Sequence, residues 1–327
     1  MIYARISGVS SYIPDDILDN EMLSKMVDTN DEWITTRVGI KERRILKKDG
    51  EGSSYMGELA VKRLLDSTGT KAEEVELLIC ATSNPDYRFP STASVIAYRC
   101  GLTRCYAYDI QAACAGFLVA LQDAAAYVRS GMYKKVVVVA AEKMSSMVNY
   151  EDRSTCALFG DGAAAMLVEP TDREVGIIDG VFHVDGIGRD HLLMPAGGSV
   201  LPTTVETVKA GQNFLFQDGR TVYKHAVTDM LESTLEIAER NNLSMESIDY
   251  LIPHQANLRI IEAVSSRAGI APEKVLVNIE KVGNTSAASI PLCIDQYREQ
   301  LKPGDRLVLT AFGAGFTWGA MYVIWDL

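Results

Sequence analysis

The sequence predicts an α/β protein built from two copies of one strand–helix plan. Along its 327 residues, apolar runs of strand length alternate with stretches in which apolar residues recur at helical spacing. The runs also recur at a steady offset, since position 248 matches position 75 (248 − 75 = 173) and position 307 matches position 136 (307 − 136 = 171). A steady offset indicates a duplication, and we expect residues 1–170 and 171–327 to form the two halves.

The elements of the first half follow from apolar spacing and from residues that cap helices. An Asn or Asp cap opens a short helix near residue 30, and Gly131 suits the end of a long helix because glycine adopts the left-handed conformation there. The apolar run at 135–141 is typical of a strand covered on both faces of its sheet. The expected strands are 4–9, 75–81, 106–110 and 135–141, and the expected helices start near residue 30, span 56–64, follow Pro90 and span 118–128.

The second half repeats this order. Its expected strands are 176–181, 248–254, 275–279 and 306–310, and its expected helices span 227–238 and start near residue 285. In α/β proteins, sites form where the carboxyl ends of strands meet helix N-termini. Two equivalent halves bring two such edges together.

The composition is that of a soluble globular protein without membrane or nucleic-acid partners. Hydrophobic residues make up 47% and charged residues 23% of the chain. The apolar runs are too short to span a bilayer, and the N-terminus lacks the pattern of a secretory signal. The six cysteines lack CxxC spacing, which favours free cytoplasmic thiols over disulfides or a metal site. The net charge of −11 argues against nucleic acid, and an anionic substrate would need positive charge concentrated locally.

Cys114 stands at a junction between a strand and a helix. Unpaired N–H groups and the positive end of the helix dipole meet at such a junction, so we expect the pKa of this thiol to be lowered and the thiol to act as a nucleophile. The small residues around it let a substrate carbonyl approach the backbone. The alternative is a buried cysteine that merely fills apolar space.

The duplication predicts that His254 and Asn284 face Cys114. His254 ends an apolar strand, and Asn284 lies at the junction that corresponds to that of Cys114 in the other half. Each also has a structural alternative, because a histidine at a strand end often only faces solvent and an asparagine often caps a helix.

Several motifs carry a resemblance to a known family. They are Asp-Ile-Gln-Ala-Ala-Cys-Ala-Gly-Phe at 109–117, Ile-Pro-His-Gln-Ala-Asn at 252–257 and Gly-Asn-Thr-Ser at 283–286, with further matches at 29–43, 159–163 and 312–319. With them the chain resembles β-ketoacyl-acyl carrier protein synthase III nearly from end to end. The resemblance implies a thiolase-like fold, in which two ββαβαβ-type halves form a five-layered αβαβα structure.

The resemblance also implies a reaction, a decarboxylative Claisen condensation that initiates fatty-acid biosynthesis. Cys114 would take the acyl group from an acyl-CoA, and His254 and Asn284 would stabilise the enolate formed from malonyl-acyl carrier protein. The backbone N–H groups of Cys114 and Ala314 would form the oxyanion hole. This acyltransferase would need no cofactor or metal and would act as a homodimer.

The substrate-binding residues are carried over from the same resemblance. Those expected to bind CoA are Trp33, Arg37, Arg153, Gly219, Tyr223 and Asn257. Those expected to dock the acidic carrier protein are Arg220, Lys224 and Arg259. Phe89 is expected to reach the acyl pocket of the partner subunit.

Some features depart from the family pattern and leave the acyl primer open between acetyl, branched and longer groups. Ala314 stands where glycine is common, Gln217 replaces a more usual methionine, and the stretch 197–219 is longer than in shorter relatives. A starter-type polyketide or acyl-transfer synthase shares the Cys-His-Asn set and is the alternative function. A non-catalytic dimer partner is a third reading, which the retained Cys114 argues against.

Overall fold

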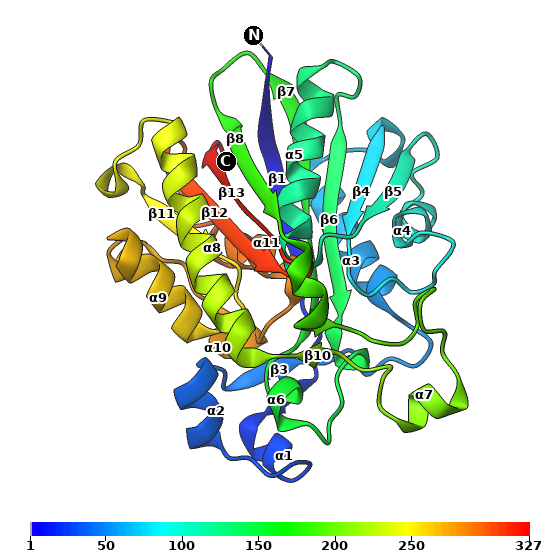
Figure 1. Cartoon of the computed structure of the whole chain (residues 1–327). Coiled ribbons are helices and arrows are strands. Elements are labelled where there is room, and N and C mark those ends of the chain that lie inside the picture. The colour runs from blue at the N-terminus through cyan, green and yellow to red at the C-terminus, as the bar shows by residue number, and fades with distance from the viewer. Residues whose placement is uncertain (1) are drawn as a thin grey trace.

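The computed structural model describes residues 2–327 and is shown in Figure 1. The strands are β1 (Tyr3–Tyr12), β2 (Ile17–Asp19), β3 (Glu42–Arg44), β4 (Leu77–Ala81), β5 (Tyr106–Ile110), β6 (Val136–Lys143), β7 (Asp161–Thr171), β8 (Gly176–Val184), β9 (Leu192–Leu193), β10 (Phe216–Gln217), β11 (Tyr250–Pro253), β12 (Arg306–Gly313) and β13 (Thr317–Ile324). The α-helices are α1 (Asn20–Ser24), α2 (Asp31–Val38), α3 (Ser53–Thr68), α4 (Thr92–Arg99), α5 (Gly116–Arg129), α6 (Arg153–Cys156), α7 (Val205–Lys209), α8 (Gly219–Arg240), α9 (Leu258–Ala268), α10 (Ile279–Val282) and α11 (Ser289–Tyr297). Two short 3₁₀ turns matter for the site, η2 (Ala113–Ala115) before α5 and η7 (Ser286–Ala288) before α11.

The strand order repeats between the two halves. The large sheet runs β11-β12-β13-β8-β1-β7-β6-β4-β5, so β1-β7-β6-β4 and β8-β13-β12-β11 follow the same order outward from the middle. In each half the inner pairs are antiparallel and the outer pair, β6 with β4 or β12 with β11, is parallel. In the described part of the chain, the two halves join through a single backbone pair, Ala4 with Ile177. The repeated order supports a duplication, while the exact division at residue 170 stays a prediction.

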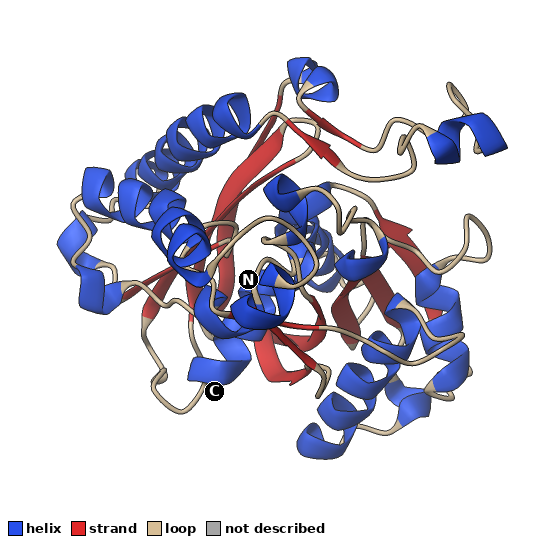
Figure 2. Cartoon of the chain, turned by 90° about the horizontal axis from the view of Figure 1, so that it is seen from below, coloured by secondary structure: helices blue, strands red, loops and turns tan. Residues whose placement is uncertain are grey.

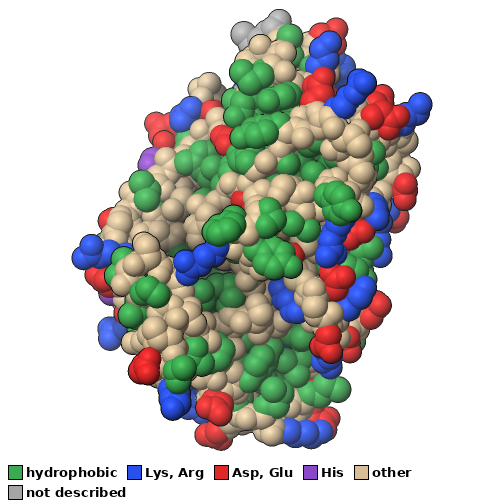
Figure 3. Space-filling model, turned by 90° about the vertical axis from the view of Figure 1, so that its right-hand side faces the viewer, with side chains coloured by type: hydrophobic (Ala, Val, Ile, Leu, Met, Phe, Trp, Pro, Cys, Tyr) green, Lys and Arg blue, Asp and Glu red, His purple; other side chains and the backbone are tan. Residues whose placement is uncertain are grey.

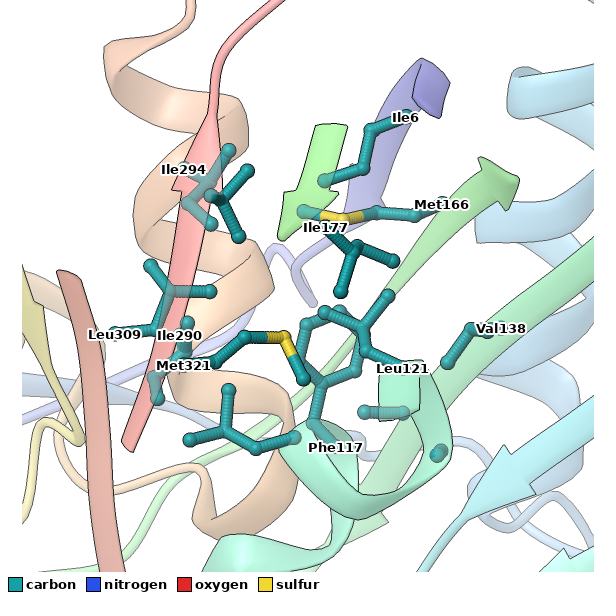
Figure 4. Packing of buried hydrophobic residues seen from close by; sticks show 14 of the residues in the cluster. Ile6, Phe117, Leu121, Val138, Met166, Ile177, Ile290, Ile294, Leu309 and Met321 are labelled. Atoms are coloured by element: carbon teal, nitrogen blue, oxygen red, sulfur yellow. The ribbon is translucent and has the colours of Figure 1, made fainter. Parts of the chain in front are cut away.

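Helices cover the outer faces of the two half-sheets, and a further pair of helices fills the space between them. Viewed from below, strands occupy the middle of the molecule with helices around them (Figure 2). Side chains of α5 and α11 share one buried cluster with inward-facing residues of strands from both halves (Figure 4). The helices α3 and α4 pack on the other face of the first half-sheet, and α8 and α9 pack on the second. The result is five layers in the order αβαβα.

One predicted strand, 275–279, is wrong. Val275 forms only an isolated bridge with Leu251, and the chain then enters α10. The Gln255 side chain takes the place of a neighbouring strand, since its amide donates to Leu276 O (3.2 Å) and accepts from Asn278 N (2.9 Å). The backbone oxygen of Leu276 and the backbone N–H of Asn278 therefore have hydrogen-bond partners without pairing with a neighbouring strand. The other predicted strands and helices are present, with boundaries that shift by a few residues.

Within residues 2–327, none of the helices is both long and apolar enough to cross a membrane. The same residues contain no cluster of three or more His, Cys, Asp and Glu side chains suited to a metal ion.

Because Phe117 of α5 lies in the helix layer between the two half-sheets, we expect its truncation to destabilise the protein strongly. Its ring is fully buried between the two half-sheets (Figure 4), so Phe117→Ala should lower the free energy of unfolding by about 3–5 kcal/mol. Urea denaturation at a fixed protein concentration measures this change. Val200→Ala is the matched control, since Val200 is 98% exposed and its truncation should change stability by less than about 0.5 kcal/mol. Equal, small effects of both substitutions would contradict the five-layer packing.

Candidate active site

Cys114 lies in the 3₁₀ turn between β5 and α5, as the junction predicts. The residue before it, Ala113, adopts a left-handed backbone conformation with φ of 46°, which is uncommon for a residue with a side chain. Ser286 has φ of 50° in the equivalent turn before α11, at an offset of 286 − 113 = 173 residues. The duplication therefore extends to two strained turns, and strain of this kind gathers at functional sites.

The loop after β12 lies directly against Cys114. A Cβ atom added at Gly313 would lie 2.6 Å from the backbone nitrogen of Cys114, so only glycine fits there. Ala314 and Gly315 line the same cavity as Cys114. Ala314 is not among the residues with positive φ, so its methyl group causes no backbone strain.

His254 is buried and held in place through one ring nitrogen. Its Nδ1 lies 2.7 Å from the hydroxyl of Ser289, the first residue of α11, and its backbone N–H donates to Thr310 O at 2.8 Å. Burial lowers the pKa of His254 to about 3, so the imidazole is neutral at physiological pH. Its Nε2 forms no hydrogen bond within residues 2–327 and is free for a ligand.

Asn284 is oriented by its own turn. Its Oδ1 accepts a hydrogen bond from the Ser286 N–H at 2.8 Å, while its backbone bonds to Leu158 O and to the Gly160 N–H. The side-chain amino group has no hydrogen-bond partner in the described part of the chain. Asn284 can therefore donate to a substrate but cannot remove a proton.

Burial dominates the acid–base properties of the thiol. The Cys114 side chain is half-buried, and its Sγ lies 3.6 Å from the Ser286 hydroxyl. Loss of solvation raises the pKa of Cys114 to about 12, although the hydrogen bond with Ser286 lowers it. The expectation of a lowered pKa in the free protein is therefore wrong, because burial outweighs the helix N-terminus. The proton of this thiol must be passed to another group before Cys114 can attack.

The three residues line one cavity of about 980 Å³. Its walls come from both halves, since β5–α5, the end of β11 and η7 all contribute. The predicted residues that line it are Cys114, His254, Asn284, Ala314, Trp33, Arg37, Gly219, Tyr223, Asn257, Arg220 and Arg259. The fold thus brings predicted residues from six separate segments of the chain to one cavity.

Arginine side chains gather near Trp33. The guanidinium groups of Arg37 and Arg153 lie 4.9 and 5.2 Å from the centre of the Trp33 ring. Arg153 does not line the cavity and is held by Asp28, to whose backbone oxygen it donates at 3.0 Å. Arg259 lies over the ring of Tyr223 at 5.7 Å. These groups supply local positive charge on a protein whose net charge is −11.

Besides Arg153, two further predicted residues do not line the cavity. Lys224 is exposed on α8 and does not line it. Phe89 is 86% exposed on the loop before α4, so within a single chain it contacts no acyl pocket. Both roles concern a second protein molecule and stay predictions.

Sequence reasoning missed several residues of the site. Ser289, Ser286 and Ser83 are small polar residues without a distinctive pattern, and they surround the thiol and the imidazole. Glu142, a carboxylate at the end of the apolar run 135–141, carried a detectable signal, because a charged residue rarely ends a buried strand unpaired. Gln217 was not missed: the sequence marked it as a departure from the family pattern, and it lines the cavity from β10.

Comparisons with known proteins agree with this geometry. Two sequence families match, "3-Oxoacyl-[acyl-carrier-protein (ACP)] synthase III" over residues 108–186 and its C-terminal counterpart over residues 238–325. The chain is 54% identical to "Beta-ketoacyl-[acyl-carrier-protein] synthase III 2" of Bacteroides thetaiotaomicron over 99% of this chain and 97% of that protein. A synthase III of Porphyromonas gingivalis is 53% identical over the same shares. The chain belongs to the β-ketoacyl-acyl carrier protein synthase III family.

Solved structures support the same assignment. The synthase III of Aquifex aeolicus is 41% identical, with a TM-score of 0.90 over 98% of this chain and 100% of that one. The priming β-ketosynthase of the R1128 polyketide pathway is 34% identical, with a TM-score of 0.91 over 99% and 96%. Membership in the synthase III family confirms the thiolase-like fold and an acyltransferase of the condensing class in fatty-acid biosynthesis.

The burial of His254 predicts that its imidazole stays neutral in the folded protein from pH 5 to pH 8. Its folded pKa, about 3, lies below the ordinary value of about 6.5 in an unfolded chain. The stability linked to the neutral ring is therefore present above pH 6.5 and is lost as the pH falls toward 3. ¹⁵N NMR of labelled histidine measures the charge, with the same signal in urea as the control. A folded-state titration between pH 5 and pH 8 would contradict the buried, neutral ring.

Proposed function

We propose that this chain condenses an acyl-CoA primer with malonyl-acyl carrier protein and so initiates fatty-acid synthesis. The observation that carries the proposal is the single cavity lined by the thiol of Cys114, the neutral imidazole of His254 and the carboxamide of Asn284. One nucleophile and two neutral donors suit a reaction in which a thioester is attacked first and an enolate is stabilised second.

In the first half-reaction, Cys114 takes the acyl group. The sulfur attacks the thioester carbonyl, the bond to the CoA sulfur breaks, and an acyl thioester remains on Cys114. Negative charge develops on the carbonyl oxygen, and the backbone N–H groups of Cys114 and Ala314 are suited to stabilise it because the Gly313 backbone lies so close.

In the second half-reaction, the malonyl thioester loses carbon dioxide. His254 and Asn284 donate hydrogen bonds to its thioester oxygen and stabilise the enolate. The resulting carbanion attacks the acyl carbon and releases Cys114. His254 can donate through Nε2 when Ser289 donates its hydroxyl proton to Nδ1. Burial strengthens both hydrogen bonds, because water does not compete for the oxygen.

The cavity wall offers places for the rest of the CoA molecule. Trp33 provides an aromatic face for the adenine, and Arg37 and Arg153 provide charges for phosphate groups. Tyr223, Asn257 and Gly219 line the path that the pantetheine would follow. Near its opening, Arg220, Lys224 and Arg259 are exposed cations suited to the acidic carrier protein.

A homodimer is part of the proposal. β5 is an edge strand of the large sheet, so one side of it has no strand partner within residues 2–327. Four aromatic side chains near this edge are strongly exposed: Tyr87, Phe89, Tyr98 and Tyr106. Figure 3 faces this side of the molecule and shows hydrophobic side chains over much of it. Pairing of two β5 edges would bury these rings and bring Phe89 to the partner subunit.

The chemistry requires no metal ion or redox cofactor, because the thioester and the departing carbon dioxide supply its driving force. All six cysteines are free, which supports a cytoplasmic location. A starter-type polyketide synthase is the second candidate, favoured by the likeness to the R1128 priming enzyme.

A panel of acyl-CoAs tests the proposed reaction. A primer that is accepted should add its acyl mass to the Cys114 peptide in mass spectrometry, and malonyl-acyl carrier protein should then remove the adduct and yield the β-ketoacyl product. The peptide of Cys156, a buried cysteine, is the internal control. Absence of an adduct with every primer would overturn the mechanism, and an adduct without turnover would favour the acyl-transfer alternative.

The role of Asn284 predicts a split between the two half-reactions. Asn284→Ala should leave acylation of Cys114 near the wild-type rate and slow condensation by about 10²–10³-fold, because it removes one donor to the enolate. Asn278→Ala is the matched control, since it removes a buried carboxamide outside the cavity. Equal slowing of both steps in Asn284→Ala would contradict the assignment.

A further inference from the structure

Glu142 is a buried carboxylate close to Cys114 that the condensation steps leave without a role. It lies near the end of β6 and is 0% exposed. Its two oxygens accept hydrogen bonds from the Ser83 N–H at 3.0 Å, the Asn84 N–H at 3.2 Å and the Thr82 hydroxyl at 3.2 Å. It forms no ion pair within residues 2–327. A buried carboxylate held by neutral donors alone is costly, so it calls for an explanation.

A line of hydroxyl groups connects Glu142 with the thiol. The Sγ of Cys114 lies 3.6 Å from the Ser286 hydroxyl, and the Ser286 hydroxyl lies 3.5 Å from that of Ser83. The Ser286 hydroxyl is also close enough to Glu142 to lower the pKa of its carboxyl group. The left-handed turn at Ser286 and its N–H bond to Asn284 fix where this hydroxyl lies. Ser286 therefore stands between the thiol and the carboxylate.

We propose that Glu142 accepts the proton of Cys114 through the Ser286 hydroxyl. The inference rests on the proposed function only in that the thiolate formed is the one that attacks the acyl-CoA. Glu142 itself touches no substrate, so it is a positioning residue that holds the proton.

The proton balance of the cycle is complete. Ser286 takes the thiol proton and passes its own to Glu142 as the sulfur–carbon bond forms and the bond to CoA breaks. The CoA thiolate takes a proton from water. When the carbanion displaces Cys114 in the second half-reaction, the departing thiolate recovers its proton from Glu142 by the same path.

The other titratable groups nearby are weaker acceptors. Burial lowers the pKa of His254 to about 3, which makes its imidazole a poor base at neutral pH. Burial raises the pKa of Glu142 to about 7, close to the value at which a base is most effective. Cys80 of β4 belongs to the cluster with Val139 and Ala141 on the other face of the sheet, and burial keeps its thiol protonated. The adjacent Lys143 directs its Nζ to the Glu51 carbonyl at 2.8 Å instead.

Alkylation of Cys114 by iodoacetamide between pH 5.5 and pH 9.5, followed on the Cys114 peptide by mass spectrometry, tests the relay. In the wild type, the rate should rise with pH and level off above about pH 7, where Glu142 is ionised. Glu142→Gln should lose this plateau and react at least about tenfold more slowly at pH 7.5. Above about pH 9 it should match or exceed the wild type, because loss of the negative charge favours the thiolate.

Two further variants separate the relay from a structural role. Ser286→Ala keeps the carboxylate, so it should be slow at pH 7.5 and stay slow at pH 9. Asp161→Asn is the matched control, since Asp161 is an equally buried carboxylate bound by the N–H groups of Leu46 and Ser145. It should keep the wild-type plateau.

A wild-type profile in Glu142→Gln would overturn the proposal. If Glu142→Gln does not fold by circular dichroism, Ser286→Ala decides, and a wild-type rate in that variant would overturn it equally. Iodoacetamide requires no acyl-CoA, so a failure of acylation in the primer panel would sink the proposed function without affecting this result.

Discussion

The packing of α5 and α11 into one layer between the two half-sheets is the constraint on which the rest of the structure depends. Each helix follows a strained 3₁₀ turn, and burial of both helices in a shared core fixes how closely the two turns approach. Cys114 belongs to the first turn, Ser286 to the second, and Asn284 directly precedes the second. The backbone strain at Ala113 and Ser286 persists in the folded protein because a large apolar core holds both helices in place.

Burial also sets the protonation state of three groups in and beside the cavity, His254, Cys114 and Glu142. The same exclusion of water keeps His254 neutral, raises the pKa of Cys114 and raises the pKa of Glu142. Loss of solvation penalises each charged form, and none of these groups has a cation among residues 2–327 that offsets the penalty. A site of this kind favours neutral donors and short proton transfers over ion pairs. Positive charge lies instead on exposed arginines beside the rings of Trp33 and Tyr223.

The helices and strands with strong apolar periodicity were predictable from the sequence. The convergence of Cys114, His254 and Asn284 was also predictable, because the two halves repeat one plan and the strand ends that carry these residues share one edge. The absence of a strand at 275–279 was not predictable. No nearby residue reveals that the Gln255 side chain forms hydrogen bonds with the backbone of this segment. The high pKa of Cys114 was missed for a similar reason. The helix N-terminus can be inferred from a few neighbouring residues, whereas burial depends on the whole fold. Ser289 and Ser286 gain meaning only from distances to residues far along the chain.

Within residues 2–327, the two half-sheets are joined by one backbone pair, Ala4 with Ile177. Their separation is therefore governed by the volume of side chains in the middle layer and hardly at all by a hydrogen-bonded ladder. Because the cavity lies between the halves, substitutions in that layer can change its width without altering the register of any strand. In this architecture the width of the cavity is a property of side-chain volume, adjustable one methylene group at a time, while Cys114, His254 and Asn284 keep their places.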